Sequence, residues 1–83
     1  MSDDQLRQTL LDALTGVAPE IDPETLRPDL NFRDQVELDS VDYLNFVLAV
    51  EKALGVRIPE QDYPRLSSLN GCLDYLAALT GSG

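Results

Sequence analysis

The chain has 83 residues, enough for one domain with a small core, because a domain of this size buries only about 60% of the surface that its unfolded chain exposes. Hydrophobic residues make up 43% of it and charged residues 25%, which is typical of a folded rather than a disordered protein. The 15 acidic and 6 basic residues give a formal net charge of -9, which excludes nucleic acid as a natural partner and favours basic protein surfaces.

The first predicted helix covers roughly residues 3–16. Its apolar residues recur at helical spacing, and Ser2 with Gln5 forms a possible capping box at its start. A long loop follows over residues 18–38, because three prolines interrupt the pattern, with a short turn at 23–26. We expect apolar side chains to pin this loop to the core, namely Ile21, Leu26, Leu30 and Phe32.

The second predicted helix covers residues 40–54, with Asp39 as its N-terminal cap and Gly55 directly after its end. A short piece at 60–63 is expected to stop at Pro64. A final helix then runs to about residue 79, capped by Ser67 or Ser68. Its expected buried face is made of Leu69, Cys72, Leu73 and Leu76.

These elements predict an all-α fold, a small bundle of three main helices plus one short helix. The domain should cover residues 1–79, followed by a frayed tail over 80–83. No apolar run approaches the roughly 20 residues that span a bilayer, and the start, MSDDQLRQ, lacks the features of a signal peptide. We therefore expect a cytoplasmic protein that does not insert into membranes, and we expect a monomer. The single cysteine, Cys72, is consistent with a reducing compartment and should be a small buried residue.

The absence of histidine removes several classes of site. The chain can form no Ser-His or Cys-His catalytic pair and no zinc site with a histidine ligand, and no segment resembles a calcium-binding loop. Carboxylate pairs such as Asp39 and Asp42 remain, but a domain this small offers little room for a dry site that would tune them. We predict that the chain is not an enzyme and has neither catalytic residues nor a metal site of its own.

The helix predicted at 40–54 has more apolar residues than one buried face needs. One stripe is typical of a packed core and consists of Tyr43, Phe46, Val47, Val50 and Leu54. A second stripe lies more than 100° away around the helix and consists of Val41, Leu44 and Leu48. This second stripe is either covered by the long loop or left free for a partner.

Acidic residues surround this helix and the segment after it, with only Lys52 and Arg57 opposing them. They are Glu37, Asp39, Asp42, Glu51, Glu60 and Asp62. An apolar strip among charges of one sign is typical of a docking surface that uses charge for steering and apolar contact for holding. A solvated acidic face that keeps a small protein soluble gives the same pattern, so both interpretations stay open.

Ser40 stands at the expected start of the second helix. A serine there ordinarily serves in capping and turn formation. Its hydroxyl would also lie at a helix N-terminus, where backbone N–H groups and the helix dipole favour an attached phosphate. Since the chain has no base to activate it, Ser40 is a candidate for modification by another enzyme rather than a nucleophile in its own right.

The segment LDSVDYLNFVLAVEKALGVRIPEQDY resembles the central part of acyl carrier proteins. The shared features are the Asp-Ser pair, an aliphatic residue, a mixed helix, a glycine and then Ile58, Pro59 and Glu60 at the family's spacing. The last segment, SLNGCLDYLAAL, also resembles the family's final helix. The resemblance covers nearly the whole chain and implies a bundle of three main helices with a short extra one.

The resemblance also implies a function. Ser40 would accept 4'-phosphopantetheine from coenzyme A, delivered by a phosphopantetheinyl transferase that supplies the base and a metal, with Asp39 helping to bind that metal. The attached thiol would carry acyl groups as thioesters to acyl-loading and acyl-processing enzymes with basic surfaces. Val41, Leu44, Leu48 and Glu51 fall at positions that the family uses for docking. A growing chain is typically sheltered between the helices.

Several residues depart from the pattern of carriers in fatty acid synthesis. Asn45 and Lys52 stand where acids are usual, Glu37 where a glycine is common, and the aromatic Tyr43 and Phe46 make the helix bulky. These departures favour a specialised freestanding carrier in a lipid or polyketide-type pathway. A peptidyl or aminoacyl carrier and an unmodified acidic helical adaptor are the alternatives.

Overall fold

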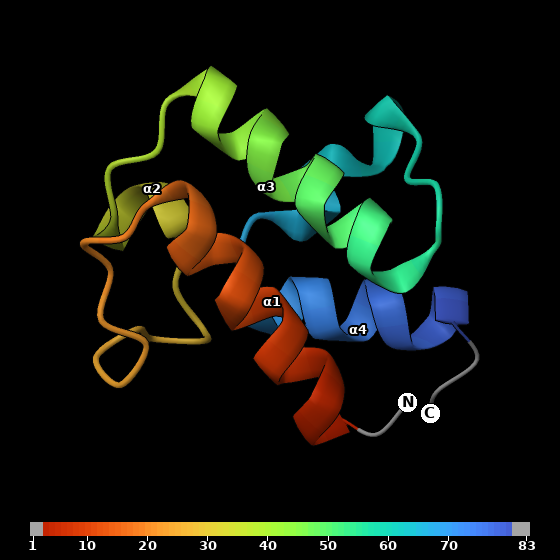
Figure 1. Cartoon of the computed structure of the whole chain (residues 1–83), viewed down its shortest axis with the longest axis horizontal. Coiled ribbons are helices and arrows are strands. Elements are labelled where there is room, and N and C mark those ends of the chain that lie inside the picture. The colour runs from red at the N-terminus through yellow and green to blue at the C-terminus, as the bar shows by residue number, and fades with distance from the viewer. Residues whose placement is uncertain (1–2, 81–83) are drawn as a thin grey trace.

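The computed structural model describes residues 3–80, which form helices around a shared core (Figure 1). In chain order these are α1 (Asp3–Val17), α2 (Phe32–Gln35), α3 (Ser40–Leu54), the 3-10 helix η1 (Glu60–Leu66) and α4 (Leu69–Thr80). α1 packs on both α3 and α4, and η1 packs on α4. The predicted all-α fold is confirmed. Within the described residues, none of the helices combines the length and the hydrophobicity that crossing a membrane requires.

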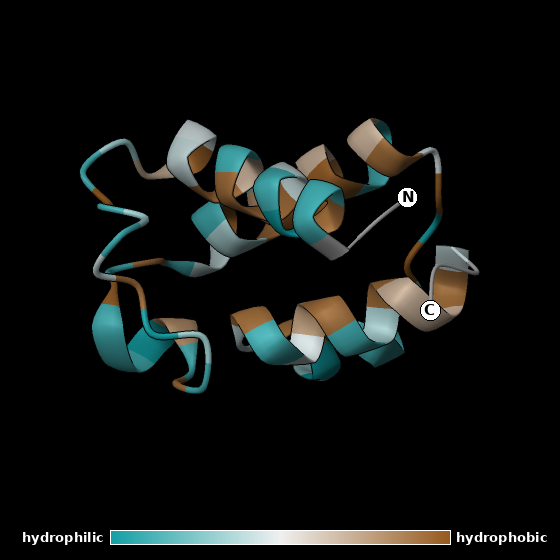
Figure 2. Cartoon of the chain, turned by 90° about the horizontal axis from the view of Figure 1, so that it is seen from below, coloured by the Kyte–Doolittle hydropathy of each residue, from teal (hydrophilic) through white to brown (hydrophobic). Residues whose placement is uncertain are grey.

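The apolar faces of the helices turn towards one another across the middle of the molecule (Figure 2). The core joins side chains from every helix and from the loop after α1, and its fully buried members are Leu6, Leu10, Leu14, Phe46, Val47, Val50, Leu66, Leu69, Cys72 and Leu76. The predicted core stripe of α3 is confirmed at Phe46, Val47 and Val50, while Tyr43 and Leu54 are half-buried and pack against this core. Cys72 is a buried free thiol, as expected.

Local signals account for the ends of α3. The Asp39 carboxylate accepts a hydrogen bond of 2.8 Å from the Asp42 N–H, which satisfies one of the free donors at the helix start. At the other end Gly55 has φ 66 and ψ 33, a left-handed conformation that favours glycine. The predicted bounds and caps of this helix are confirmed.

The N-terminus of α4 is capped by one of the two serines predicted for this role, Ser67 or Ser68. The Ser68 hydroxyl accepts a hydrogen bond of 3.0 Å from the Gly71 N–H, so Ser68 rather than Ser67 is the capping residue. A Cβ at Gly71 would lie 2.6 Å from the Arg65 carbonyl oxygen, so the close approach of α4 to η1 requires glycine there. α4 ends at Thr80, one residue beyond its predicted end and the first residue of the expected tail. The rest of that tail, and the Ser2 capping box, lie outside the described residues.

The long loop predicted between α1 and α3 is present, and it contains one further short helix, α2, that the sequence did not predict. α2 is a single turn, too short for a helical pattern to be visible in the sequence. It is held by its surroundings, since Phe32 is buried and its N–H donates to the Ser67 carbonyl at 2.8 Å. Of the four apolar residues expected to hold the loop to the core, three are buried: Ile21, Leu26 and Phe32. Leu30 is 36% exposed and does not hold the loop.

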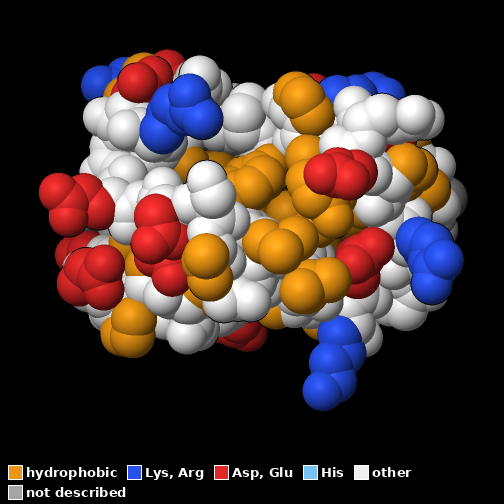
Figure 3. Space-filling view, turned by 90° about the horizontal axis from the view of Figure 1, so that it is seen from above, with side chains coloured by type: hydrophobic (Ala, Val, Ile, Leu, Met, Phe, Trp, Pro, Cys, Tyr) orange, Lys and Arg blue, Asp and Glu red, His pale blue; other side chains and the backbone are white. Residues whose placement is uncertain are grey.

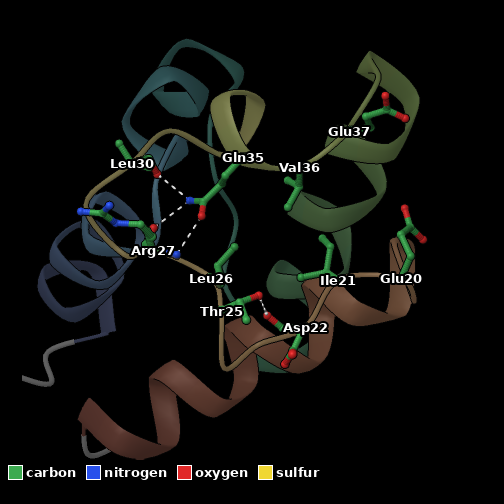
Figure 4. A pocket seen from close by; sticks show the side chains of 10 residues that line it. All are labelled: Glu20, Ile21, Asp22, Thr25, Leu26, Arg27, Leu30, Gln35, Val36 and Glu37. Carbon is green, nitrogen blue, oxygen red and sulfur yellow. Dashed lines mark hydrogen bonds between the residues drawn. The ribbon is translucent and has the colours of Figure 1, made fainter.

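A polar side chain holds the loop where Leu30 was expected to. The Gln35 amide accepts from the Arg27 N–H and donates to the Arg27 carbonyl, both at 2.7 Å, and it also donates to the Leu30 carbonyl at 3.1 Å (Figure 4). One amide thereby satisfies three backbone groups of the loop.

η1 is longer than the expected piece at residues 60–63, because it continues through Pro64 to Leu66. Proline lacks the N–H of other residues, but its fixed φ lies within the range of a 3-10 helix, so one short helix can contain it. The extension buries Leu66 in the core.

Candidate functional site

Ser40 is the first residue of α3, and its side chain is exposed. Asp39 provides the capping bond at this helix end, and the Ser40 hydroxyl makes no hydrogen bond to another residue within 3–80. Capping therefore does not account for this hydroxyl. It stands instead at the positive end of a helix of 15 residues, where the backbone stabilises an anionic group.

A groove of about 660 Å³ opens beside Ser40 between the start of α3, α2 and η1. Its apolar and aromatic lining comes from Phe32, Leu38, Tyr43, Leu44, Tyr63 and Pro64, and its polar lining from Asn31, Arg33, Asp39, Ser40, Glu60 and Ser67. Of the residues predicted for the site, Ser40, Asp39 and Leu44 thus share one groove. Val41, Leu48 and Glu51 do not line it.

The inner wall of this groove is closed by Tyr43. Its hydroxyl donates a hydrogen bond of 2.6 Å to the Tyr63 carbonyl, which joins α3 to η1. Burial raises the pKa of this hydroxyl to about 12, with smaller contributions from Cys72 and Tyr63 in the same direction. Burial likewise raises the pKa of the Cys72 thiol to about 12, so this thiol stays protonated and unreactive at neutral pH.

The second apolar stripe of α3 is not covered by the loop. Val41 is 64% exposed, Leu44 43% and Leu48 48%, whereas the neighbouring Val47 is fully buried. Hydrophobic side chains gather over the α3 side of the molecule, with acidic side chains among and beside them (Figure 3). We refer to Val41, Leu44 and Leu48 as the α3 strip.

The acidic residues around α3 differ in their surroundings. Glu37, Asp39 and Glu60 are exposed, and Asp42 is half-buried. Within residues 3–80, no acidic side chain near α3 forms an ion pair with a lysine or arginine. The negative charge beside the strip is therefore available to a basic partner.

Two other acidic side chains of this group have structural partners. The Glu51 carboxylate accepts a hydrogen bond of 2.6 Å from the Ile58 N–H, which fixes the loop after α3. The Asp62 carboxylate accepts one of 2.7 Å from the Tyr75 hydroxyl, which ties η1 to α4 and raises the pKa of Tyr75. The sequence did not predict either contact. Ile58 lies several residues after Glu51 along the chain, and Tyr75 lies further still from Asp62, so no local pattern marks these pairs.

A second depression, of about 550 Å³, lies on the loop side of the molecule (Figure 4). It has an apolar floor that includes Ile21, Leu26 and Val36, and acidic groups at its rim. Glu37 belongs to it, but none of the residues predicted to bind a cofactor or to dock a partner does. We therefore take the groove beside Ser40 as the candidate functional site.

Comparison with known proteins identifies the family of the chain. The family model described as "Phosphopantetheine attachment site" matches residues 5–76 of the chain. The acyl carrier protein of Acidothermus cellulolyticus is 29% identical over 82 residues, which cover 99% of this chain and 96% of that protein. The acyl carrier protein of Syntrophobacter fumaroxidans is 35% identical over 57 residues, which cover 69% of this chain and 70% of that protein.

The chain belongs to the acyl carrier protein family. A solved acyl carrier protein from Enterococcus faecalis shares its fold, with a TM-score of 0.72 over 94% of this chain and 98% of that one, at 21% sequence identity. Members of the family are carriers rather than enzymes, and they work with a phosphopantetheinyl transferase and with acyl-processing enzymes. The prosthetic group that the family implies for this carrier is covalently attached 4'-phosphopantetheine.

The groove beside Ser40 fits such a group chemically. Attachment needs an accessible hydroxyl, and the side chain of Ser40 is exposed and engaged in no hydrogen bond within the described residues. The attached phosphodiester is anionic, which suits the N-terminus of α3, and Arg33 brings a cationic side chain to the lining of the same groove. Among the described residues, no cluster of potential metal ligands is present.

Proposed function

We propose that Ser40 is the residue of this carrier to which 4'-phosphopantetheine is attached. The observation that supports it most is the free, exposed hydroxyl at the start of α3, in a position where Asp39 already provides the cap. The thiol of the bound group supplies the chemistry of the carrier, because it holds an acyl group as a thioester. The chain itself holds the attachment point and presents it.

The attachment is a phosphoryl transfer from coenzyme A. The Ser40 Oγ forms a bond to the phosphorus that bears the pantetheine, the pyrophosphate bond of coenzyme A breaks, and adenosine 3',5'-bisphosphate leaves. The hydroxyl proton passes to a base of the transferase, because this chain has no histidine to take it up. Asp39, next to Ser40 and exposed, is the residue that we propose to help hold the transferase's metal ion.

We propose the α3 strip as the docking surface for the transferase and for acyl-processing enzymes. Its support is that three large apolar side chains stay exposed on the helix that begins at Ser40, beside acidic groups that form no ion pair within residues 3–80. Apolar contact would hold a partner, and the net charge of -9 would attract basic surfaces at a rate that falls with ionic strength. Glu51 remains a proposed member of this surface, although its carboxylate also serves the fold.

The pathway that we propose is a specialised one, of lipid or polyketide type. It is supported by Asn45 and Lys52, which are both exposed on α3 and reduce its negative charge compared with carriers that have acids there. A partner chosen by charge would therefore differ from the enzymes that recognise a uniformly acidic helix. We further propose that the carrier acts in the cytoplasm as a monomer, in agreement with its single, buried cysteine.

One experiment tests the attachment proposal. The purified chain is incubated with coenzyme A, magnesium and a broad-specificity phosphopantetheinyl transferase, and its intact mass is measured. We expect one added phosphopantetheine on the wild type and on Ser67→Ala, a control in the same groove, and none on Ser40→Ala. A wild type that stays unmodified with several transferases would instead favour an unmodified acidic adaptor, and addition to Ser40→Ala would assign the attachment to another residue.

A further inference from the structure

The groove beside Ser40 is the route by which an acyl group attached there could reach the core. Ser40 and Tyr43 line its α3 side, and Tyr63 and Pro64 of η1 line the other. Behind it lies Phe46, which is 1% exposed and belongs to the core. Whether a carried chain can pass between α3 and η1 therefore depends on the side chains at the inner wall.

Four aromatic side chains form a continuous row at this wall, three of them lining the groove and the fourth, Phe46, lying buried behind them. The rings of Phe32 and Phe46 meet edge to face with their centroids 5.6 Å apart, and the centroids of Tyr43 and Phe46 are 6.3 Å apart. The row ends at Tyr63, whose ring meets that of Tyr43 edge to face at 6.4 Å. These separations lie within the range of favourable aromatic contacts, and we call the four residues the aromatic barrier.

A hydrogen bond locks the barrier across the two helices. The part-buried bond from the Tyr43 hydroxyl to the Tyr63 carbonyl would have to break for α3 and η1 to separate, and it would leave both groups without a partner. η1 is also fixed from behind, because the Tyr75 hydroxyl binds Asp62 and the Arg65 guanidinium lies 4.9 Å from the centre of the Tyr75 ring. η1 thus cannot move outward without breaking contacts with two helices.

The core behind the barrier is already filled by side chains. Leu66, Leu69 and Cys72 are all at most 1% exposed, and they come from two different helical elements. Interiors of this kind are close-packed, and additional methylene groups force side chains into unfavourable rotamers. A long alkyl chain would have to displace these residues as well as the barrier.

We propose that the aromatic barrier keeps the acyl group of this carrier in the surface groove, and that its cargo is a short or polar acyl group rather than a long saturated chain. The inference rests on the proposed attachment at Ser40. The lining of the groove suits such a cargo, since aromatic side chains stand beside Asn31, Arg33 and Ser67, which offer hydrogen bonds to a substituted chain. Shelter between the helices, which the family resemblance implies, is then not available to a long chain here.

A series of loaded carriers tests the inference. The transferase is supplied with acetyl-, butyryl-, octanoyl- or dodecanoyl-coenzyme A, and the intact mass shows that each group has been added at Ser40. If a chain entered the core, each fully buried methylene would raise the melting temperature by roughly 3 to 6 °C in a domain of this size. We expect no rise with chain length along the series, measured by circular dichroism.

Chemical shifts give a second readout on the same samples. In the octanoyl form we expect changes of the backbone amide signals at groove residues such as Arg33 and Ser67, and none at Leu69 or Cys72. A melting temperature that climbs with chain length, or shifts that reach Leu69 and Cys72, would overturn the inference while leaving the attachment intact. Failure to load Ser40 would count against the proposed function instead, so the two failures are distinguishable.

Removing the barrier should restore access to the core. In Tyr43→Ala both the ring and the hydrogen bond are lost, and we expect the octanoyl form of this variant to melt several degrees above its own unacylated form, as buried methylenes predict. Tyr75→Phe is the matched control, because it loosens η1 on the α4 side and leaves the groove unchanged. An equal gain in Tyr75→Phe would refute a specific role of Tyr43. If Tyr43→Ala does not fold, the wild-type series still decides the question.

Discussion

Replacing Leu48 by lysine separates a docking surface from a core position. Leu48 is 48% exposed, so it loses only about half of the 1.5–3 kcal/mol that full burial of a leucine contributes, and leucine and lysine have similar helix propensities. The stem of the lysine can cover part of the same surface. We therefore expect the free energy of unfolding to fall by about 1 kcal/mol or less. Val47→Lys should unfold the chain, because Val47 is fully buried.

The effect of Leu48→Lys on docking should be larger than its effect on stability. Loss of a central apolar contact in an interface typically costs about 1–2 kcal/mol, which lowers kcat/KM of the transferase about 5- to 30-fold, and the new positive charge adds repulsion from a basic partner. The assay is the rate of loading followed by intact mass, with urea unfolding on the same variant. Ala78→Lys adds the same charge at an exposed position of α4 and serves as the control. Gross unfolding of Leu48→Lys, or a loading rate equal to that of the wild type, would refute the assignment of Leu48 to a docking surface.

Two further predictions follow from side-chain contacts in the fold. Because burial raises the pKa of Cys72 from 9.0 to about 12 and that of Tyr43 from 10.0 to about 12, the unfolded chain loses these protons first. Stability should be complete below about pH 9 and fall towards pH 12, as urea unfolding along a pH series would show, and a flat profile would contradict the assigned burial. Glu51→Ala should lower the free energy of unfolding by about 1–3 kcal/mol, because the hydrogen bond to the Ile58 N–H is lost, and Glu51→Gln should lower it by less. If the wild type and both variants are equally stable in urea, Glu51 is a docking residue only.

What the sequence predicted well depends on local signals. The bounds of α3 follow from the capping side chain of Asp39 and the left-handed Gly55, both of which act within a few residues of the helix ends. The core stripe of the same helix follows from its 3.6-residue period. These features need no knowledge of the rest of the fold, and the structure agrees with them.

What the sequence could not predict depends on contacts between distant segments. α2 is one turn that exists because Phe32 is buried and its N–H reaches Ser67, and the loop before it is held by the Gln35 amide rather than by Leu30. The sequence also could not predict whether the α3 strip is exposed, because helical spacing is the same whether a loop covers a stripe or leaves it exposed. Only the path of the loop in space decided between the two.

The aromatic barrier shows the same limit in the candidate site. Tyr43 was expected on the core stripe, and its bulk was visible in the sequence, but its partner is a backbone carbonyl of η1. Any residue can offer a carbonyl, so no residue type marks this contact. The prediction of Ser40 with Asp39 as the attachment site rests on the family resemblance as well as on helix capping.

Locating the prosthetic group on the chain tests directly whether this protein is a carrier that is modified at Ser40. Cleavage after Arg33 and Lys52 releases the fragment of residues 34–52, in which Ser40 is the only serine or threonine. After incubation with coenzyme A and a phosphopantetheinyl transferase, we predict that this fragment alone gains the mass of one phosphopantetheine and that fragmentation places it on Ser40. An unmodified fragment 34–52 in a protein that has gained this mass, or a protein that gains none with any transferase, would contradict attachment at Ser40.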